Sequence, residues 1–138
     1  MIEKTDDIDT CREIRREVFV IEQSVPEAEE WDNRDGEAIH LLARDDSGQA
    51  VGTARILFDG ATGKIGRVAV RKSARGTGLG AALIRAAMDE LRTFPAITHA
   101  KLGAQTHAIG FYEKLGFAAY GPEYQDGGIP HRDMIREL

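Results

Sequence analysis

The chain has little of several features that mark whole classes of protein. Its 138 residues include a single cysteine, Cys11, so an internal disulfide is excluded and a reducing compartment is expected. No apolar run approaches the roughly 18 residues that a membrane-spanning helix needs, and the N-terminus does not resemble a signal peptide. We therefore expect a cytoplasmic protein without membrane attachment. Internal repeats and long linkers are also missing, which predicts a single domain over residues 1–138.

Positive charge is in the minority as well. Eighteen Lys and Arg residues stand against twenty-three Asp and Glu residues, a net charge of −5, so a nucleic-acid partner is not expected. The four histidines have neither i,i+4 pairing nor thiol partners, which argues against a metal site. No serine or cysteine stands beside a residue that could activate it as a nucleophile. Cys11 shares helical spacing with Ile14 and Val18, so we expect it in the core.

One stretch departs from this acidic background. Residues 64–88 contain six Lys or Arg residues and no Asp or Glu. The stretch reads as a strand over 65–70, a glycine-rich turn over 71–80, and a helix whose apolar stripe runs to Leu91. The turn's glycines would leave backbone N–H groups open to a ligand, and such groups at a helix N-terminus attract anions. The stretch therefore predicts a binding site for a phosphate-bearing ligand.

Two nucleotide-binding motifs are matched only superficially. A P-loop through Gly63 and Lys64 would need Gly at position 58 and Ser or Thr at 65, where the chain has Phe58 and Ile65. The dinucleotide fingerprint is matched formally by Gly76-x-Gly78-x-x-Ala81. However, the acid expected after the next strand would fall near Gln105, and the chain supplies only one β-α-β unit. A dinucleotide-binding domain is therefore the weaker interpretation.

Periodicity and turn residues predict the element order β-α-β-β-β-α-β-α-β-β. The fold class is α/β (α+β), with one mixed sheet of about seven strands and flanking helices. The strand at 99–104 should lie parallel to 65–70. A ten-residue connection, 121–130, should join two final strands whose exposed edges would allow a monomer or a homodimer. The expected strands are 1–4, 38–44, 50–58, 65–70, 99–104, 117–120 and 131–137. The first helix should have Thr5, Asp6 or Asp7 as its N-cap and run to about Phe19, and the other main helices are 79–91 and 108–115.

Two motifs resemble those of the GNAT N-acetyltransferase superfamily. The first is Arg75-x-x-Gly78-x-Gly80, which matches the superfamily's Arg/Gln-x-x-Gly-x-Gly/Ala pattern. The second, about thirty residues downstream, is Phe111-Tyr112-Glu113-Lys114-Leu115-Gly116-Phe117. The predicted element order is also that of the superfamily, so the resemblance covers nearly the whole chain. Three further segments look like the bacterial ElaA-like branch: Val18-Phe19-Val20-x-Glu22-Gln23-x-Val25-Pro26, Ala104-Gln105-Thr106, and Gly128-Ile129-Pro130-His131-x-x-Met134.

The resemblance implies that acetyl-CoA is the acyl donor and that the acetyl group passes directly to an amine in a ternary complex, without a metal. The central parallel strands would splay around CoA, whose pantetheine arm would lie along the strand as a pseudo-strand. The 3′-phosphate or diphosphate would lie near Arg71 and Lys72. The implied CoA-binding residues are Val68, Ala69 and Val70 for the pantetheine arm and the acetyl carbonyl, Arg75, Gly76, Thr77, Gly78, Leu79, Gly80 and Ala81 for the pyrophosphate, and Gln105.

The resemblance also identifies the general acid of the reaction but does not identify its general base. Tyr112 matches the superfamily's general acid, and a phenol has a pKa near that of a leaving thiol. Some relatives carry a glutamate base at the position of Gly66, which cannot take a proton. The open candidates are Glu22, His40, His131 or a water relay. A non-catalytic acyl-CoA-binding module is the alternative function.

Seven acids and one base lie between residues 22 and 37. This segment reads either as a solvated acidic loop or as a wall for a cationic acceptor. In either interpretation the acceptor is a small-molecule or peptide amine.

Overall fold

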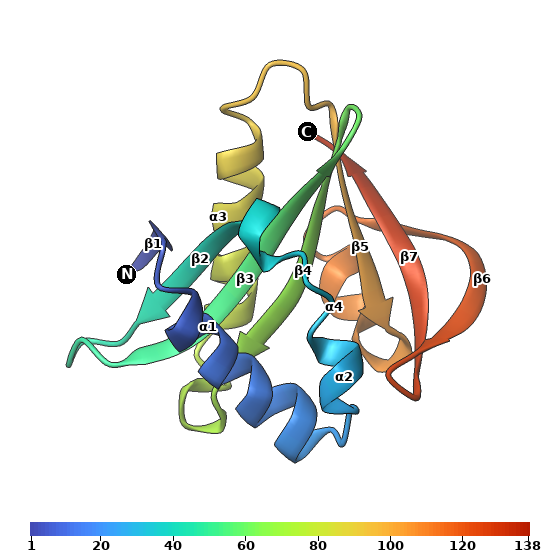
Figure 1. Cartoon of the computed structure of the whole chain (residues 1–138). Helices are drawn as coiled ribbons and strands as arrows, with labels where there is room; N and C mark the ends of the chain where they lie inside the picture. The colour runs from blue at the N-terminus through green and yellow to red at the C-terminus, as the bar shows by residue number, and fades with distance from the viewer.

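A computed structural model describes residues 1–138 and is built around one mixed sheet (Figure 1). Its strand order is β1-β2-β3-β4-β5-β7-β6, and every neighbouring pair is antiparallel except β4 and β5, which run parallel. The seven-stranded mixed sheet with flanking helices confirms the predicted fold class. The strands are β1 (Ile2–Thr5), β2 (Ile39–Arg44), β3 (Ala50–Asp59), β4 (Thr62–Val70), β5 (His99–Gln105), β6 (Ala118–Asp126) and β7 (Ile129–Glu137).

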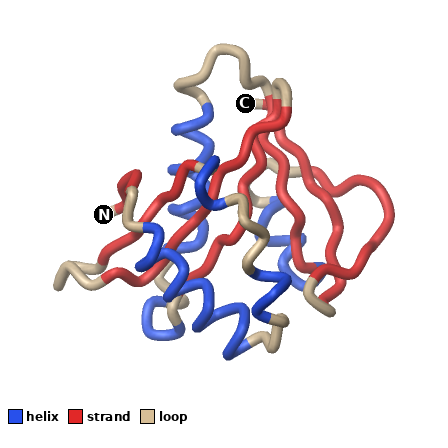
Figure 2. The backbone as a smooth tube through the Cα atoms, viewed as in Figure 1, coloured by secondary structure: helices blue, strands red, loops and turns tan.

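Helices cover both faces of the sheet (Figures 1 and 2). On one face lies α1 (Ile8–Arg15), which continues as a π-helix, η1 (Arg16–Glu22), and is followed by α2 (Glu27–Glu30). On the other face lie α3 (Leu79–Leu91) and α4 (Ile109–Glu113). No helix is both long and apolar enough to cross a lipid bilayer. Short 3₁₀ turns complete the chain: η2 (Asp35–Glu37), η3 (Lys72–Ala74) and η4 (Thr106–Ala108).

The main core lies between α3 and the sheet. The apolar stripe of α3 is buried against residues of the central strands, which include Ile56, Ile65 and Leu102. Gly63 permits this packing, because a Cβ atom there would lie 2.2 Å from a methyl carbon of Leu91. A smaller core under α1 contains Cys11, which is fully buried as predicted. The buried stripe of α3 is Leu83, Ile84, Ala87, Met88 and Leu91.

The two parallel strands separate after a short contact. β4 pairs with β5 only at Thr62–Lys64, opposite His99–Lys101. The pairing therefore lies before the predicted segment 65–70, which diverges from β5 instead of running along it. A β-bulge accentuates the divergence, because Arg67 and Val68 together oppose one residue of β3, and Arg67 has a left-handed φ of 49°. The expected splay of the central pair is thus confirmed.

The C-terminal hairpin differs from its prediction in two ways. β6 and β7 are nine-residue strands joined by Gly127 and Gly128, whose φ angles are +60° and +78°, so the predicted ten-residue connection is wrong. A break in the register between Tyr120 and Tyr124 interrupts the strand pattern and explains the error. In addition, β7 lies between β5 and β6 and is not an exposed edge. The edge strands are β1 and β6.

The first helix starts at one of its predicted N-caps, Asp7, but ends later than predicted. It begins at Ile8, where the Asp7 carboxylate accepts a hydrogen bond from the backbone N–H of Thr10 at 3.2 Å. Beyond Arg15 it widens into η1 and reaches Glu22 instead of stopping at Phe19. A π-helix shifts the side chains that follow it around the axis, and such segments often occur at functional sites. Here it brings Val18, Phe19 and Glu22 to the cavity described next.

Candidate active site

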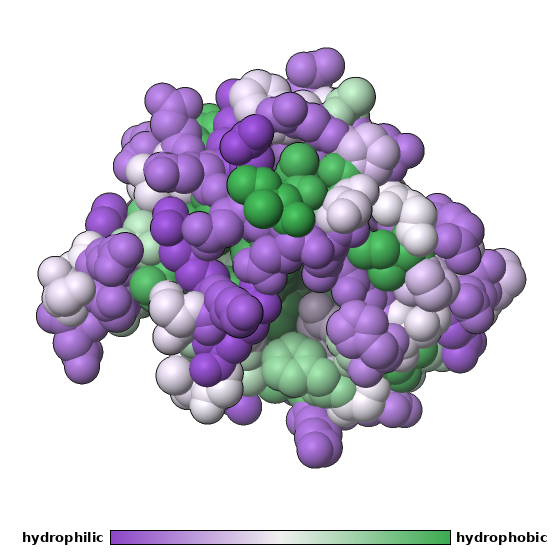
Figure 3. All heavy atoms as spheres, turned by 90° about the horizontal axis from the view of Figure 1, so that it is seen from below, coloured by the Kyte–Doolittle hydropathy of each residue, from purple (hydrophilic) through white to green (hydrophobic).

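A cavity of about 720 Å³ opens where β4 and β5 diverge. Figure 3 views the molecule from this end and shows a hollow near the centre of the surface. The cavity is walled by β4, β5, the start of α3, α4, η1 and the β6–β7 turn. Thr77 does not line it; its hydroxyl donates to the Ala74 carbonyl at 2.7 Å. The other predicted site residues all do: Val68, Ala69, Val70, Arg75, Gly76, Gly78, Leu79, Gly80, Ala81, Gln105 and Tyr112.

The start of α3 offers a row of free backbone donors. The N–H groups from Gly76 through Ala81 donate no hydrogen bond within the protein, and the next residue, Ala82, is the first to bond back, to Gly78. Gly76 and Gly78 have φ angles of +77° and +83°, and a Cβ on either would project into open space. These donors and the helix dipole fit a phosphate group. We name residues 76–81 the N–H cradle.

The basic residues near the cradle have different partners. Arg75 donates from Nε to the Val70 carbonyl at 3.0 Å and from Nη2 to Glu22 at 2.7 Å. Arg71 and Lys72 do not line the cavity, and the Arg71 guanidinium lies 3.6 Å from the Glu17 carboxylate. Arg75 is therefore the basic side chain of this turn that faces the cavity.

The second half of β4 presents unpaired backbone to the cavity. β3 covers one edge of the strand, but beyond Lys64 the edge facing β5 has no partner. An extended ligand placed there can hydrogen-bond to the backbone as an added strand would. Gly66 lines the same wall, and a Cβ there would meet no atom within 4 Å.

Tyr112 lies on α4, between Phe111 and Phe117, whose ring centroids are 5.0 and 6.3 Å from its own. Burial raises the pKa of its phenol above the ordinary value. The hydroxyl has no hydrogen-bond partner within the protein, and Tyr112 lines the cavity. It can therefore donate a proton to a group bound there.

Gln105 lies at the end of β5, and both polar atoms of its side-chain amide already form hydrogen bonds within the protein. Its Nε2 donates to the Gln23 side chain at 3.0 Å, and its Oε1 accepts from His107 at 2.7 Å. These bonds tie the end of β5 to the residue that follows η1.

The three candidate bases lie in different surroundings. Glu22 lines the cavity, but its carboxylate is paired with Arg75. His40 is buried outside the cavity and bonds through Nε2 to the Asp35 carbonyl at 2.9 Å. His131 lines the cavity, is 9% exposed, and bonds through Nδ1 to the Ile129 carbonyl at 2.7 Å.

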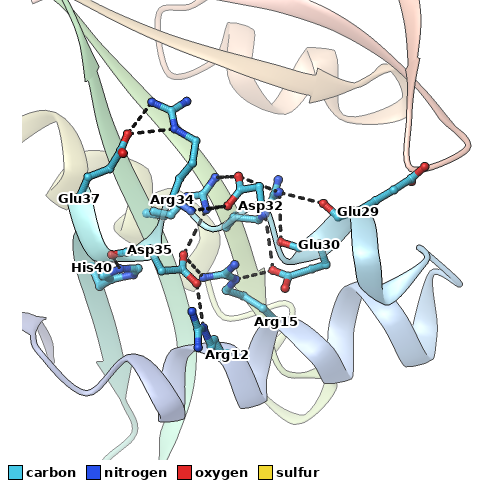
Figure 4. Close-up of polar contacts among 11 residues, drawn as sticks. Arg12, Arg15, Glu29, Glu30, Asp32, Arg34, Asp35, Glu37 and His40 are labelled. Carbon is cyan, nitrogen blue, oxygen red and sulfur yellow. Dashed lines mark hydrogen bonds and ion pairs between the residues drawn. The ribbon is translucent and has the colours of Figure 1, made fainter.

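Much of the acidic segment belongs to a buried ion network beside the cavity (Figure 4). Asp35 is 4% exposed and contacts Arg12, Arg15 and Arg55, which hold its pKa well below the usual range despite burial. The Arg55 guanidinium lowers the pKa of Asp32 to about 2. The network consists of the acids Glu30, Asp32 and Asp35 and the arginines Arg12, Arg15, Arg55 and Arg67.

Only part of the segment is left to face the cavity. Glu22, Glu29 and Glu30 line it, whereas Asp32 and Asp35 do not. In Figure 4 the Glu29 carboxylate points away from the network, and Glu29 forms no ion pair. The acids of the segment therefore divide between structural ion pairs and a small cavity-facing set.

Several residues that line the cavity were not predicted from the sequence to belong to the site. Arg67 reaches the cavity because of the β-bulge, and Tyr124 and Asp126 lie in the segment that was predicted to be a connection. Recognising that segment as strand would have placed both residues beside His131, since Tyr124 is its cross-strand partner.

Comparisons with known proteins agree with this geometry. A family model described as the acetyltransferase (GNAT) domain matches residues 6–138. A Bacillus subtilis (strain 168) protein, provisionally named an acetyltransferase, is 40% identical over 99% of this chain and 93% of its own. The crystal structure of Escherichia coli ElaA superposes with a TM-score of 0.86 at 30% identity, covering 99% of this chain and all of the other.

The fold is also shared with a Bacillus subtilis acetyltransferase that was solved in complex with CoA. Its TM-score is 0.75 at 17% identity, with 99% of this chain and 97% of the other covered. The match to the family model spans nearly the whole chain, and the sheet order, the splayed strands and the N–H cradle fit it. The chain belongs to the GNAT acetyltransferase family.

Proposed function

We propose that the protein is an acetyl-CoA-dependent N-acetyltransferase that transfers the acetyl group directly to the amine of a small molecule or peptide. The observation that carries this proposal is that one cavity contains all three parts of the proposed site. One space of about 720 Å³ is lined by five of the six residues of the N–H cradle, by the open edge of β4 and by Tyr112, whose hydroxyl is free. A phosphate site, a site for an extended arm and a proton donor are the three elements that transfer from a thioester of CoA requires.

Each wall of the cavity would have a different role in the reaction. The cradle would hold the diphosphate of CoA, and the β4 backbone from Val68 to Val70 would bond the pantetheine arm. A backbone N–H of the same segment would stabilise the acetyl oxygen as it gains negative charge. Tyr112 would give its proton to the departing thiolate. The fold shared with a CoA-bound acetyltransferase supports this arrangement.

The charges around the rest of the cavity favour a cationic acceptor. Glu29 and Asp126 line it without forming ion pairs, whereas Arg75 is engaged with Glu22 and Arg67 with the buried network. An amine that carries a second positive group would find two carboxylates unneutralised by the protein. Polyamines and lysine-containing peptides have this chemistry.

The proposal is tested by following thiol release from acetyl-CoA with a panel of polyamines, amino acids, aminoglycosides and lysine peptides. Amine-dependent release above the hydrolysis background is expected, with the acetylated amine detected by mass spectrometry. The absence of such release with every amine would favour a non-catalytic acyl-CoA-binding module.

A thermal melt tests the ligand separately. CoA should raise the melting temperature, and NAD or NADP should leave it unchanged. Stabilisation by a dinucleotide without any by CoA would overturn the assignment of the cradle.

A further inference from the structure

The geometry points to His131 as the general base that takes the proton from the acceptor amine. This inference rests on the proposed function and adds to it the residue that the Gly66 position cannot supply. It is drawn from the tautomer of His131, its setting in the cavity, and the exclusion of the two other candidates by their own contacts.

The hydrogen bond at Nδ1 fixes the tautomer of the neutral imidazole. The Ile129 carbonyl oxygen, 2.7 Å away, can only accept, so Nδ1 must carry the hydrogen. The lone pair of the neutral ring therefore lies on Nε2. That atom has no hydrogen-bond partner within the protein, although the residue is nine-tenths buried and lines the cavity. Nε2 itself is still open to solvent, and an accessible acceptor without a protein partner is available to a bound ligand.

The ring is held in place by its neighbour on β6. Tyr124 stacks against the imidazole, with centroids 5.9 Å apart and planes inclined by 23°, and its hydroxyl donates to Asp133 at 2.7 Å. Gly103 on β5 makes room for this hydroxyl, since a Cβ there would lie 2.5 Å from it. Tyr124 is thus a positioning residue, which holds the imidazole at the cavity wall.

The strand register places the imidazole beside the site of transfer. His131 is the cross-strand partner of Gln105, the last residue of β5, where β5 has already diverged from β4. Tyr112 lines the same cavity from α4. A proton donor and a proton acceptor therefore border one space, as a reaction that both releases a thiol and consumes an amine requires.

The proton balance is complete with these two groups. The amine nitrogen forms a bond to the acetyl carbon as the carbon–sulfur bond breaks. The acceptor arrives as an ammonium, since only about one in a few thousand alkylamines with a pKa near 10.4 is neutral at pH 7. His131 Nε2 takes one proton from it and leaves the neutral nucleophile. The proton of Tyr112 goes to the sulfur, so CoA leaves as a thiol, and the second nitrogen proton, released as the amide forms, restores the Tyr112 phenol. His131 then returns its proton to water.

The two other candidates are less suited to this step. Glu22 Oε2 accepts from the Arg75 guanidinium, whose positive charge makes the carboxylate a weaker base, and His40 does not line the cavity. The titratable groups around His131 are Tyr124 and Asp126 on β6, His107 on η4, whose Nε2 is bonded to Gln105, and Asp133 on its own strand. None of them occupies the Nε2 lone pair.

The test compares His131→Asn with the wild type, using the best amine found in the panel. General-base removal typically costs about 10²–10⁴-fold, and we expect a loss of this size in kcat at pH 7. The loss should shrink as the pH rises toward 10, because solvent then deprotonates the amine. It should also shrink with a less basic acceptor such as a hydrazine. A purely structural role for His131 would give the same loss at every pH and with both acceptors.

Two controls complete the design. His99→Asn changes the same side chain at the far end of β5, outside the cavity, and should match the wild type. The melting-temperature shift with CoA reports whether His131→Asn still folds and binds the donor. A wild-type protein without amine turnover would refute the proposed function. Turnover by His131→Asn within threefold of wild type at pH 7, or a deficit independent of pH, would refute the role of His131 alone.

Discussion

Arg75 Nη2 lies 2.7 Å from Glu22 Oε2, which joins the turn before α3 to the end of the π-helix. The same guanidinium donates from Nε to the Val70 carbonyl. Both residues line the cavity, Arg75 next to the N–H cradle, and the side chains of Arg75 and Glu22 are 43% and 29% exposed. An exposed pair of this kind contributes little to stability, but it sets a negative charge beside the site proposed for a diphosphate.

Glu22→Gln should therefore tighten CoA binding. Removal of one carboxylate near the diphosphate should lower the Kd of CoA by up to about fivefold, the equivalent of 1 kcal/mol for an exposed charge. The kcat should stay within threefold of wild type, because Glu22 is not the base. Isothermal titration and steady-state kinetics measure the two quantities. A hundredfold fall in kcat that recovers at high pH would instead assign the base to Glu22.

Tyr112→Phe should reduce kcat by about 10²–10³-fold and leave the Kd of CoA unchanged, because it removes the proton donor to the thiolate. Burial raises the pKa of Tyr112, so the wild-type phenol stays protonated to above pH 10. The deficit of the variant should then be constant between pH 7 and 9.5, in contrast to that of His131→Asn.

Tyr120→Phe is the matched control, since Tyr120 is exposed on β6 and lies outside the cavity. Its kcat should equal that of the wild type. If Tyr112→Phe also retains wild-type turnover with an active acceptor, the proton must reach the thiolate from another group.

The N–H cradle could be predicted from the sequence because its determinants are local, whereas Tyr112 was identified through the resemblance of its segment to a GNAT motif. Glycines at positions that need a positive φ, a basic turn and a helical period lie next to one another along the chain. Gly116 likewise has a φ of +89° just after α4, as expected for a residue that ends a helix. Such features depend on backbone conformation within a few residues.

The features that were missed depend on contacts between distant residues. The interior position of β7 follows from its pairing with β5, which no local pattern specifies. Asp35 looked like one acid of a solvated loop, yet it is buried against Arg15 and Arg55, each 20 positions away. The setting of His131 required the hairpin that brings Tyr124 beside it.

Gly78→Ala tests the cradle. The φ of +83° strains any residue with a Cβ, at a cost of about 1–2 kcal/mol, and the added methyl would project into the proposed phosphate site. We expect the Kd of CoA to rise at least tenfold, with a small fall in melting temperature. Gly48→Ala is the matched control, because Gly48 has a similar φ of +85°, its Cβ would also meet no atom within 4 Å, and it does not line the cavity. Equal CoA affinity for Gly78→Ala and wild type would show that the phosphates bind elsewhere.

The buried ion network predicts a loss of stability in acid. The pKa of Asp32 is lowered to about 2, against an ordinary value near 3.9, so its contribution is complete above about pH 5 and is lost as the pH falls through 2. Asp35, whose pKa is also lowered, acts in the same direction. Urea unfolding between pH 7 and 3 should show the decline.

Asp35→Asn should lower the free energy of unfolding by about 3–5 kcal/mol at pH 7, because it leaves the buried guanidinium of Arg15 short of a partner. Asp89→Asn, which breaks an exposed i,i+3 pair with Arg92, should change stability by less than about 0.5 kcal/mol. A neutral effect of Asp35→Asn would mean that the remaining acids compensate the network fully.

Glu29→Gln tests the charge of the acceptor. Glu29 lines the cavity from α2, and its carboxylate points away from the ion network, so it is free to attract a second ammonium group on the acceptor (Figure 4). We expect the KM for a diamine or polyamine to rise about fivefold, and that for a monoamine with a neutral tail to stay unchanged. Glu27→Gln is the matched control, since Glu27 lies on the same helix, pairs with Arg16 at 3.4 Å and does not line the cavity. Equal effects of the two substitutions would attribute the change to net charge, and the acceptor would then not contact Glu29.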